Sequence, residues 1–530
     1  MRAAKTSALS RLFPGRTDGQ VGCLLLLTLP LLLAACKGPA AETSLKVLGG
    51  SELSDLKPIL DDVAKQTGVT LDISYTGTLD GTEQLLSGAA TPDLVWFSSA
   101  RYLGLQSGLK GKLLASEKIM LSPVVLGVKA SAAKKWGWTN HKVSWKDIAA
   151  KAGSGELSYG MANPAASNSG LSALIGVVAA LSGKGDAITA ADVTSDELKG
   201  FFKGQALTAG SSGWLAEAYM RDQDRLNGLI NYESVLLSLN AGGKLNEPLT
   251  LIYPQDGLIT ADYPVVLLNK GRQADYDKLV TALKSPEVQA RIMNETRRRP
   301  VNPAVKLSSA FPAGLNIELP FPGSADTLNA VLGAYLQDTR RPANTIFVLD
   351  TSGSMKGDRM DALKSSLQGL TGADTSLTGQ FSGFASRERV TLLPFDSSVA
   401  AAEVTEIGSD KSAALAQLNT RIAALAPDGG TNIYGALEAA YGQAKSAPAG
   451  RYTSIVLMTD GESNEGPSPA QFRRYYQALP ASVKSVKTFT ILFGDGNKDA
   501  MNEIATLTGG RTFDGTKNLQ AAFKQIRGYQ

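Results

Sequence analysis

The feature that most constrains the fold is an apolar run at residues 346–349 that passes directly into a polar loop. The loop begins at Asp350 and presents two hydroxyls, at Ser352 and Ser354. A short apolar run that ends in this way is typical of a buried strand, with the carboxylate at its carboxyl end. In a parallel sheet the carboxyl ends of several strands share one edge, and ligands bind there.

Two later loops carry the same kind of side chain. Gly429 and Gly430 lead to Thr431, and Asp460 follows a second strand-like run at residues 454–458. Carboxylates and hydroxyls are hard oxygen ligands, which suit Mg²⁺ or Mn²⁺. One Asp-Ser loop alone is a common turn, but three such loops in the correct strand or helix context predict a metal site.

The second half of the chain alternates strands and helices. Strands are expected at residues 345–350, 389–395, 454–460, 486–494 and 511–513, and helices at residues 359–370, 411–425, 433–444, 470–479, 499–507 and from 518 onward. This alternation predicts a doubly wound α/β (Rossmann-like) domain over residues 343–530. A proline-rich stretch, residues 306–342, precedes it and is expected to be a linker with a short helix.

The set of loops resembles the metal-ion-dependent adhesion site of von Willebrand factor type A domains. The resemblance implies that Ser352, Ser354 and Thr431 bind a divalent ion directly or nearly so. It also implies that Asp350 and Asp460 act directly or through water. Because such a site leaves one coordination position open, the resemblance implies a protein partner that supplies an acidic side chain to the metal.

The first half of the chain also alternates strand-like and helix-like segments. Strands are expected at residues 45–48, 69–75, 94–99 and 123–128. The pattern predicts a parallel α/β architecture over residues 45–305.

Four stretches of this half resemble bacterial periplasmic solute-binding proteins with two α/β lobes (type II). They are residues 122–128, 161–170, 231–234 and 253–264. The first and last resemble strands that cross between the lobes, and the other two resemble loops that present side chains to a ligand. The resemblance implies a bilobal domain that closes on a small solute.

The composition of these loops indicates which residues would contact the solute. Residues 167–170 precede an apolar helix at residues 171–180, and free N–H groups at a helix start favour an anion or a carbonyl. We therefore expect a small polar or anionic ligand, although ordinary helix capping explains any single serine equally well. The predicted ligand-binding residues are Ser51, Ser98, Ser99, Ser167, Asn168, Ser169 and Tyr232.

The N-terminus has the pattern of an export signal. The first 18 residues contain four basic side chains and one acidic one. An apolar stretch at residues 21–33 follows, which is short for a bilayer span, and residues 1–35 are expected to form the signal peptide. Residues 33–36, Leu-Ala-Ala-Cys, come next, and the whole segment resembles a bacterial lipoprotein signal. The resemblance implies acylation of Cys36 and a tether over residues 36–44. It also implies a lipid-anchored extracytoplasmic protein of the cell envelope. The full chain carries a net charge of +4, so little charge remains beyond the signal and nucleic acid is not an expected partner.

Catalytic patterns are scarce. The chain has one histidine, His141, which argues against Ser-His-Asp or Cys-His catalysis and against zinc sites built from His and Cys. No G-x-x-x-x-G-K-[ST] phosphate loop occurs. We therefore expect a binding protein and no enzyme. Two alternatives stay open: a solute receptor of a membrane transporter, and a hydrolase that uses metal-activated water.

Overall fold

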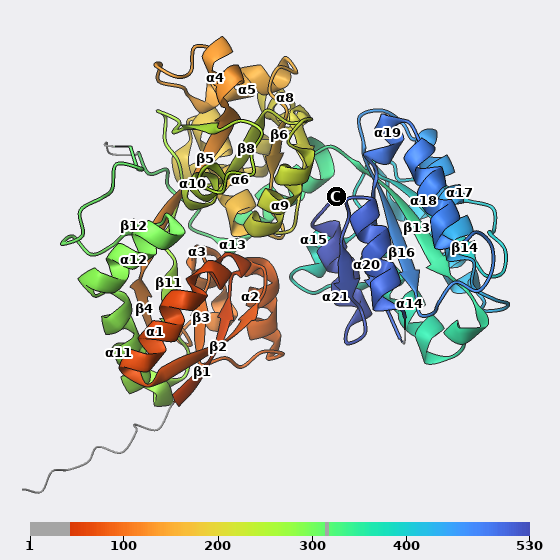
Figure 1. The fold of residues 1–530 in the computed structure, drawn as a ribbon, viewed down its shortest axis with the longest axis horizontal. Coiled ribbons are helices and arrows are strands. Elements are labelled where there is room, and N and C mark those ends of the chain that lie inside the picture. Colours follow the sequence, from red (N-terminus) through yellow and green to blue (C-terminus); the bar gives the residue numbers. More distant parts are fainter. Residues whose placement is uncertain (1–42, 313–316, 495) are drawn as a thin grey trace, which may run out of the picture. The chain divides into compact units, whose positions relative to one another are not determined.

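Three sheets organise the part of the chain that the computed structural model describes, residues 43–312, 317–494 and 496–530 (Figure 1). The predicted signal peptide and Cys36 lie outside the described residues. Two sheets belong to the N-terminal half and one to the C-terminal half, and residues 42–530 pack as one unit. The prediction of a bilobal α/β domain followed by a doubly wound α/β domain is confirmed.

Lobe one is built on a sheet of order β2-β1-β3-β11-β4. Its strands β1, β2 and β3 are parallel, whereas β11 runs antiparallel to both of its neighbours. The strands are β1 (Thr43–Gly49), β2 (Val69–Tyr75), β3 (Leu94–Trp96), β4 (Ala115–Lys118) and β11 (Pro264–Leu267). The helices are α1 (Lys57–Thr67), α2 (Thr78–Ser87), α3 (Arg101–Gly104), α11 (Gln273–Leu283) and α12 (Pro286–Thr296), with a 3₁₀ turn at Ser51–Leu56.

Lobe two is built on a sheet of order β10-β5-β8-β6-β7, with β9 and β12 also paired to β5. The strands are β5 (Met120–Lys129), β6 (Tyr159–Met161), β7 (Gln205–Leu207), β8 (Gly228–Tyr232), β9 (Leu249–Ile252), β10 (Thr260–Ala261) and β12 (Arg299–Pro300). The helices are α4 (Ala130–Lys135), α5 (Trp145–Gly153), α6 (Asn168–Ser182), α7 (Ala190–Val193), α8 (Asp196–Lys203), α9 (Ser212–Asp222) and α10 (Glu233–Ala241).

The chain crosses between the lobes from β4 to β5, from β10 to β11 and from α12 to β12. At the third crossing two adjacent arginines hold opposite lobes. Arg298 is buried and pairs with Asp55 of lobe one at 2.7 Å, and Arg299 pairs with buried Glu233 of lobe two at 2.7 Å. The relative position of the lobes is therefore tied to the backbone of two consecutive residues.

The C-terminal domain has a sheet of order β15-β14-β13-β16-β17-β18, parallel except for the edge strand β15. After the linker helix α13 (Ala325–Ala334), the strands are β13 (Ala343–Asp350), β14 (Arg389–Phe395), β15 (Glu403–Glu406), β16 (Tyr452–Thr459), β17 (Lys487–Leu492) and β18 (Thr512–Asp514). The helices are α14 (Asp358–Gln368), α15 (Gly379–Ser382), α16 (Ser412–Ala424), α17 (Ile433–Lys445), α18 (Pro469–Ala478), α19 (Ala481–Lys484), α20 (Lys498–Leu507) and α21 (Leu519–Arg527).

The central strand β13 explains why helices cover both faces of this sheet. All eight of its residues are buried. Because side chains alternate across a strand, Phe347 and Leu349 join one core with α14, α16 and α21. Ile346 and Val348 join the opposite core with α17, α18 and α20. A strand that is buried at every position, with apolar side chains on both faces, lies between two helical layers.

Two expectations about the sheets were incomplete. The sheets of the N-terminal half are mixed and not purely parallel, because β4, β5 and β11 pair antiparallel around the crossings. Residues 94–99 were expected to be a buried strand that runs into a polar loop, and the strand ends at Trp96; the carbonyl of Ser98 in the loop accepts hydrogen bonds from the amides of Asp262 and Tyr263 at the second crossing.

A buried carboxylate, Glu388, fastens the linker and the last helix to the C-terminal sheet. It pairs with Arg340, just after the linker helix, and with Arg527 of α21 at 2.9 Å, and all three side chains are buried. Burial alone would raise the pKa of Glu388, but the charges of Arg527 and Arg340 lower it below the ordinary value. The carboxylate is therefore charged at neutral pH and neutralises part of the arginine charge.

We predict that Glu388→Ala destabilises the protein by about 3–5 kcal/mol, because it leaves two buried guanidinium groups without their counter-charge. Since the pKa of Glu388 is lowered on folding, its contribution is present at neutral pH and is lost as the pH falls below the ordinary range of glutamate. Denaturant unfolding followed by circular dichroism measures both effects. Glu503→Ala is the matched control, because the pair of Glu503 with Arg473 is about half exposed and should contribute less than about 1 kcal/mol. Equal stability losses in the two variants would contradict the prediction.

Candidate functional site

The three predicted metal loops leave the C-terminal sheet at one edge. Asp350 is the last residue of β13, Asp460 directly follows β16, and Thr431 lies two residues before α17. Strands β13 and β16 are parallel neighbours, so their carboxyl ends are level. The backbone also joins the loops, because the amide of Gly353 donates to the carbonyl of Gly429 at 3.0 Å.

The polar groups of these loops converge on a small space. The hydroxyls of Ser352 and Ser354 lie 3.0 Å apart, and the Ser354 hydroxyl donates to Asp460 Oδ1 at 2.7 Å. A β-carbon built on Gly461 would lie 3.9 Å from both the Ser354 and the Thr431 hydroxyl oxygens. The structure therefore brings together the five residues that the sequence nominated.

Burial differs across the site. Asp350, Ser352, Thr431 and Asp460 are buried, whereas Ser354 is exposed. Burial raises the pKa of Asp350, and the nearby charge of Asp460 adds to the rise, although hydrogen bonds from Ser352 oppose it. Two buried carboxylates close together, Asp350 and Asp460 at the edge of the C-terminal sheet, favour a cation between them.

Sequence reasoning missed several supporting residues. Thr459 donates its hydroxyl to Asp350 Oδ2, and Asn464 Oδ1 accepts from the amide of Thr431 at 2.8 Å. Arg359, in the first turn of α14, donates to Asp460 Oδ2. Position next to the predicted aspartate was a usable signal for Thr459, but Arg359 and Asn464 are brought to the site only by the fold.

The donor set fits a small hard cation. It consists of two carboxylates and three hydroxyls, and oxygen ligands of this kind suit Mg²⁺ or Mn²⁺. The described residues contain no cluster of three or more His, Cys, Asp or Glu side chains suited to a metal. An ion in this domain would thus rely on hydroxyls for part of its coordination, as these loops allow.

The predicted cleft residues form a hydrogen-bonded chain between the lobes. Tyr232 of β8 donates its hydroxyl to Ser98 Oγ of lobe one at 2.8 Å, and the amide group of Asn168 donates to the same Tyr232 oxygen at 3.1 Å. All three side chains are buried. These groups therefore satisfy one another and hold the lobes together at this point.

The other predicted cleft residues have different surroundings. The hydroxyls of Ser167 and Ser169 lie 3.0 Å apart, and the hydroxyl of Ser99 accepts a hydrogen bond from the amide of Arg101 at 3.2 Å. Ser51 lines a cavity of about 110 Å³. The cavity lies just beyond the carboxyl ends of β1, β2, β6 and β7, and its lining includes Asn163 and Trp214, which sequence reasoning did not nominate.

Two family matches agree with this division of the chain. Residues 45–295 match the bacterial extracellular solute-binding proteins, and residues 344–527 match the von Willebrand factor type A domain. The chain combines a solute-binding domain with a von Willebrand factor type A domain. Both matches lie inside the limits predicted from the sequence, 45–305 and 343–530.

Known proteins resemble parts of this chain. An uncharacterized protein of Synechocystis sp. (strain ATCC 27184 / PCC 6803 / Kazusa) is 28% identical over 193 residues, which is 36% of this chain and 42% of that protein. The chain therefore matches less than half the length of that relative.

Solved structures resemble each domain separately. The periplasmic binding protein AfuA from Actinobacillus pleuropneumoniae, with exogenous fructose-6-phosphate bound, has 16% identity and a TM-score of 0.44, over 56% of this chain and 99% of that one. The ferric binding protein from Campylobacter jejuni has 16% identity and a TM-score of 0.40, over 55% of this chain and 98% of that one. A von Willebrand factor type A protein from Catenulispora acidiphila has 18% identity and a TM-score of 0.30, over 36% of this chain and 43% of that one.

The two families indicate a general role. Solute-binding and von Willebrand factor type A domains are binding modules and typically have no enzymatic activity, and the first family is extracellular. Among the described residues, the helices are all too short or too polar to span a membrane. The solute-binding family match indicates a binding function and an extracytoplasmic location for that domain.

We predict that Tyr232→Phe destabilises the solute-binding domain by about 1–3 kcal/mol, because Ser98 and Asn168 lose a buried partner. All five tryptophans lie within residues 96–214, so tryptophan fluorescence during urea unfolding follows this domain, with Trp214 also sensing its contact with Tyr529 of the C-terminal domain. Tyr75→Phe is the matched control, since Tyr75 is 48% exposed. A Tyr232→Phe protein as stable as the control would contradict the proposed bridge between the lobes.

Proposed function

We propose that this protein is a lipid-anchored binding protein of the bacterial cell envelope. Its von Willebrand factor type A domain binds a protein partner through Mg²⁺ or Mn²⁺, and its solute-binding domain holds a small polar or anionic ligand. The observation that carries the proposal is the convergence of Asp350, Ser354 and Asp460 at one edge of the C-terminal sheet.

The metal-dependent step rests on the chemistry of the donor set. Asp350, Ser352, Ser354, Thr431 and Asp460 would hold the ion. A bound divalent ion would supply a Lewis-acidic position for a carboxylate of the partner. The exposure of Ser354 beside the buried aspartates supports access from outside, while Thr459 orients Asp350 and Arg359 orients Asp460. These buried contacts keep the ligands in place before the partner arrives.

The solute-binding step rests on the cavity at the carboxyl ends of strands from both lobes. Ligands of open α/β sheets bind at such ends. Ser51 Oγ is buried there without a hydrogen-bond partner among the described residues, which supports a ligand that would satisfy it. The membrane anchor rests on the signal pattern that ends at Cys36.

We predict that Asp350→Ala abolishes divalent-ion binding in calorimetric titration with Mg²⁺ or Mn²⁺. The expected loss of affinity exceeds about 100-fold, since even groups outside the coordination shell are worth about 10- to 100-fold. Asp358→Ala is the matched control, because Asp358 is exposed on the same segment and is expected to leave binding unchanged.

The same pair of variants tests the protein partner. A fragment of residues 40–530 should retain its partner from an envelope extract in Mg²⁺ and release it in EDTA, and Asp350→Ala should retain none. Unchanged ion binding by Asp350→Ala, or equal capture with and without metal, would refute the metal-dependent interaction.

We predict that Cys36→Ser releases the protein from membranes into the soluble fraction and stops incorporation of labelled palmitate. Stable anchoring needs more than one acyl chain, and Cys36 would carry them. Cys23→Ser lies within the predicted signal peptide and should remain membrane-bound. A Cys36→Ser protein that sediments with membranes as the wild type does would remove the lipid anchor from the proposal.

A further inference from the structure

The cavity that Ser51 lines has walls from three parts of the molecule. Asp80 belongs to lobe one, Trp214 belongs to lobe two, and Thr378 and Lys524 belong to the von Willebrand factor type A domain. The solute-binding domain alone would leave this cavity open on one side. The third wall, formed by Thr378 and Lys524, belongs to the site only if the C-terminal domain is held against the two lobes.

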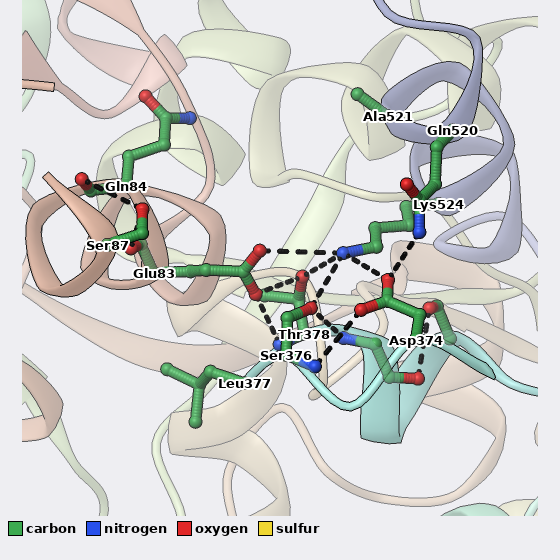
Figure 2. A network of polar contacts seen from close by, with 12 residues as sticks. Glu83, Gln84, Ser87, Asp374, Ser376, Leu377, Thr378, Gln520, Ala521 and Lys524 are labelled. Atoms are coloured by element: carbon green, nitrogen blue, oxygen red, sulfur yellow. Dashed lines mark hydrogen bonds and ion pairs between the residues drawn. The ribbon is translucent and has the colours of Figure 1, made fainter. Parts of the chain in front are cut away.

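Lobe one holds the third wall through Glu83 of α2, as Figure 2 shows. The amide and the hydroxyl of Thr378 each donate to Glu83 Oε2 at 2.6 Å, and Lys524 Nζ lies 3.5 Å from Oε1. Lys524 also pairs with Asp374 of its own domain at 2.7 Å. Burial opposes the charge of Glu83, but the hydrogen bonds from Thr378 and the charge of Lys524 lower its pKa overall.

Lobe two holds the same domain through different contacts. The indole of Trp214 stacks on the ring of Tyr529 with centroids 6.0 Å apart, and the guanidinium of Arg511 lies 4.1 Å from the Trp214 ring. Lys487 pairs with Asp222 at 2.7 Å, and both side chains are about one-fifth exposed. The C-terminal domain therefore contacts both lobes across the mouth of the cleft.

The last turn of α21 closes the cavity at close range. Asn163 donates its side-chain amide to the carbonyl of Arg527 at 3.3 Å, and a β-carbon on Gly528 would lie 3.1 Å from the α-carbon of Gly210. Because Arg527 is paired with buried Glu388, this turn moves with its domain. This wall of the cavity is thus fastened to the C-terminal domain.

The charge around the cavity selects among solutes. The charged side chains of the lining are Asp80, Lys524 and Arg527. Lys524 is paired with Glu83 and Asp374 just outside the cavity, and Arg527 is paired with Glu388. Burial raises the pKa of Asp80 to about 6, the charge of Glu83 adds to the rise, and Lys524 opposes it. At neutral pH Asp80 is mainly a carboxylate, and the two cations of the lining are already neutralised by their carboxylate partners. Asp80 is therefore the charge left to a solute, and it favours groups that donate hydrogen bonds.

We propose that the von Willebrand factor type A domain completes the solute site, which takes a small solute that donates hydroxyl or amine hydrogen bonds to Asp80. This inference rests on the proposed solute binding and narrows its ligand to the polar, non-anionic class. Since the solute contacts the two lobes and the C-terminal domain together, solute binding and domain docking strengthen each other by the same factor. Solute occupancy would thereby influence how the metal-bearing domain is held.

The test uses the full chain with three probes: erythritol as a neutral polyol, putrescine as a diamine and inorganic phosphate as an anion. Erythritol or putrescine should bind in calorimetry at least tenfold more tightly than phosphate, and Asp80→Asn should weaken that binding at least tenfold. The double variant Glu83→Ala/Asp222→Ala removes one contact of the C-terminal domain with each lobe, both outside the cavity lining, and should weaken probe binding at least fivefold. Asp72→Asn, exposed on β2, is the matched control and should change nothing.

Hydrogen exchange of residues 208–216 provides a readout of docking that needs no solute. Exchange should rise in Glu83→Ala/Asp222→Ala and fall when the probe is added to the wild type. Unchanged exchange in the double variant, or unchanged probe affinity despite faster exchange, would overturn the coupling. Tight binding of phosphate that survives Asp80→Asn, or binding only by solutes of another class, would overturn this inference and leave solute binding intact. If no solute of any class binds, the proposed function of the cleft falls as well.

Discussion

The parallel pairing of β13 with β14 and β16 is the constraint on which the C-terminal domain depends. Its buried residues alternate between two helical layers, so the strand cannot shift by one residue without exchanging the two cores. The same register places the carboxyl ends of β13 and β16 side by side. The oxygens of Asp350 and Asp460 therefore converge because the hydrophobic packing allows no other register.

The solute-binding domain depends on a different kind of constraint. Its lobes are joined by three crossings, and the adjacent arginines Arg298 and Arg299 bind opposite lobes. The Ser98–Tyr232 hydrogen bond closes the cleft further along. These polar contacts lie beside a hydrophobic core that contains residues of both lobes, so the two lobes pack against each other as well as being bridged. The C-terminal domain contacts both lobes, through Thr378 on Glu83 and through Tyr529 on Trp214.

The residues that could be predicted were those with a strong local signal. Asp350 followed an apolar run at residues 346–349, and residues 389–395 and 69–75 carried enough strand pattern for their limits to match β14 and β2. The strands that escaped prediction, such as β10 and β12, have two residues each, and no periodicity exists over so short a length. Among the cleft residues, Ser98, Asn168 and Tyr232 were nominated as ligand contacts, and the structure places them in hydrogen bonds with one another.

The sequence by itself determined the order of the longer strands and helices of the C-terminal half, the presence of two α/β regions and the oxygen-rich loops, because these follow from local periodicity and from side chains next to strand ends. Only the tertiary structure decided that Arg359 binds Asp460, that Glu83 binds Thr378 and that Trp214 stacks on Tyr529. These contacts join residues separated by about one hundred to three hundred positions. Such pairs leave no periodic trace in the chain, since their proximity arises from packing between elements and between domains.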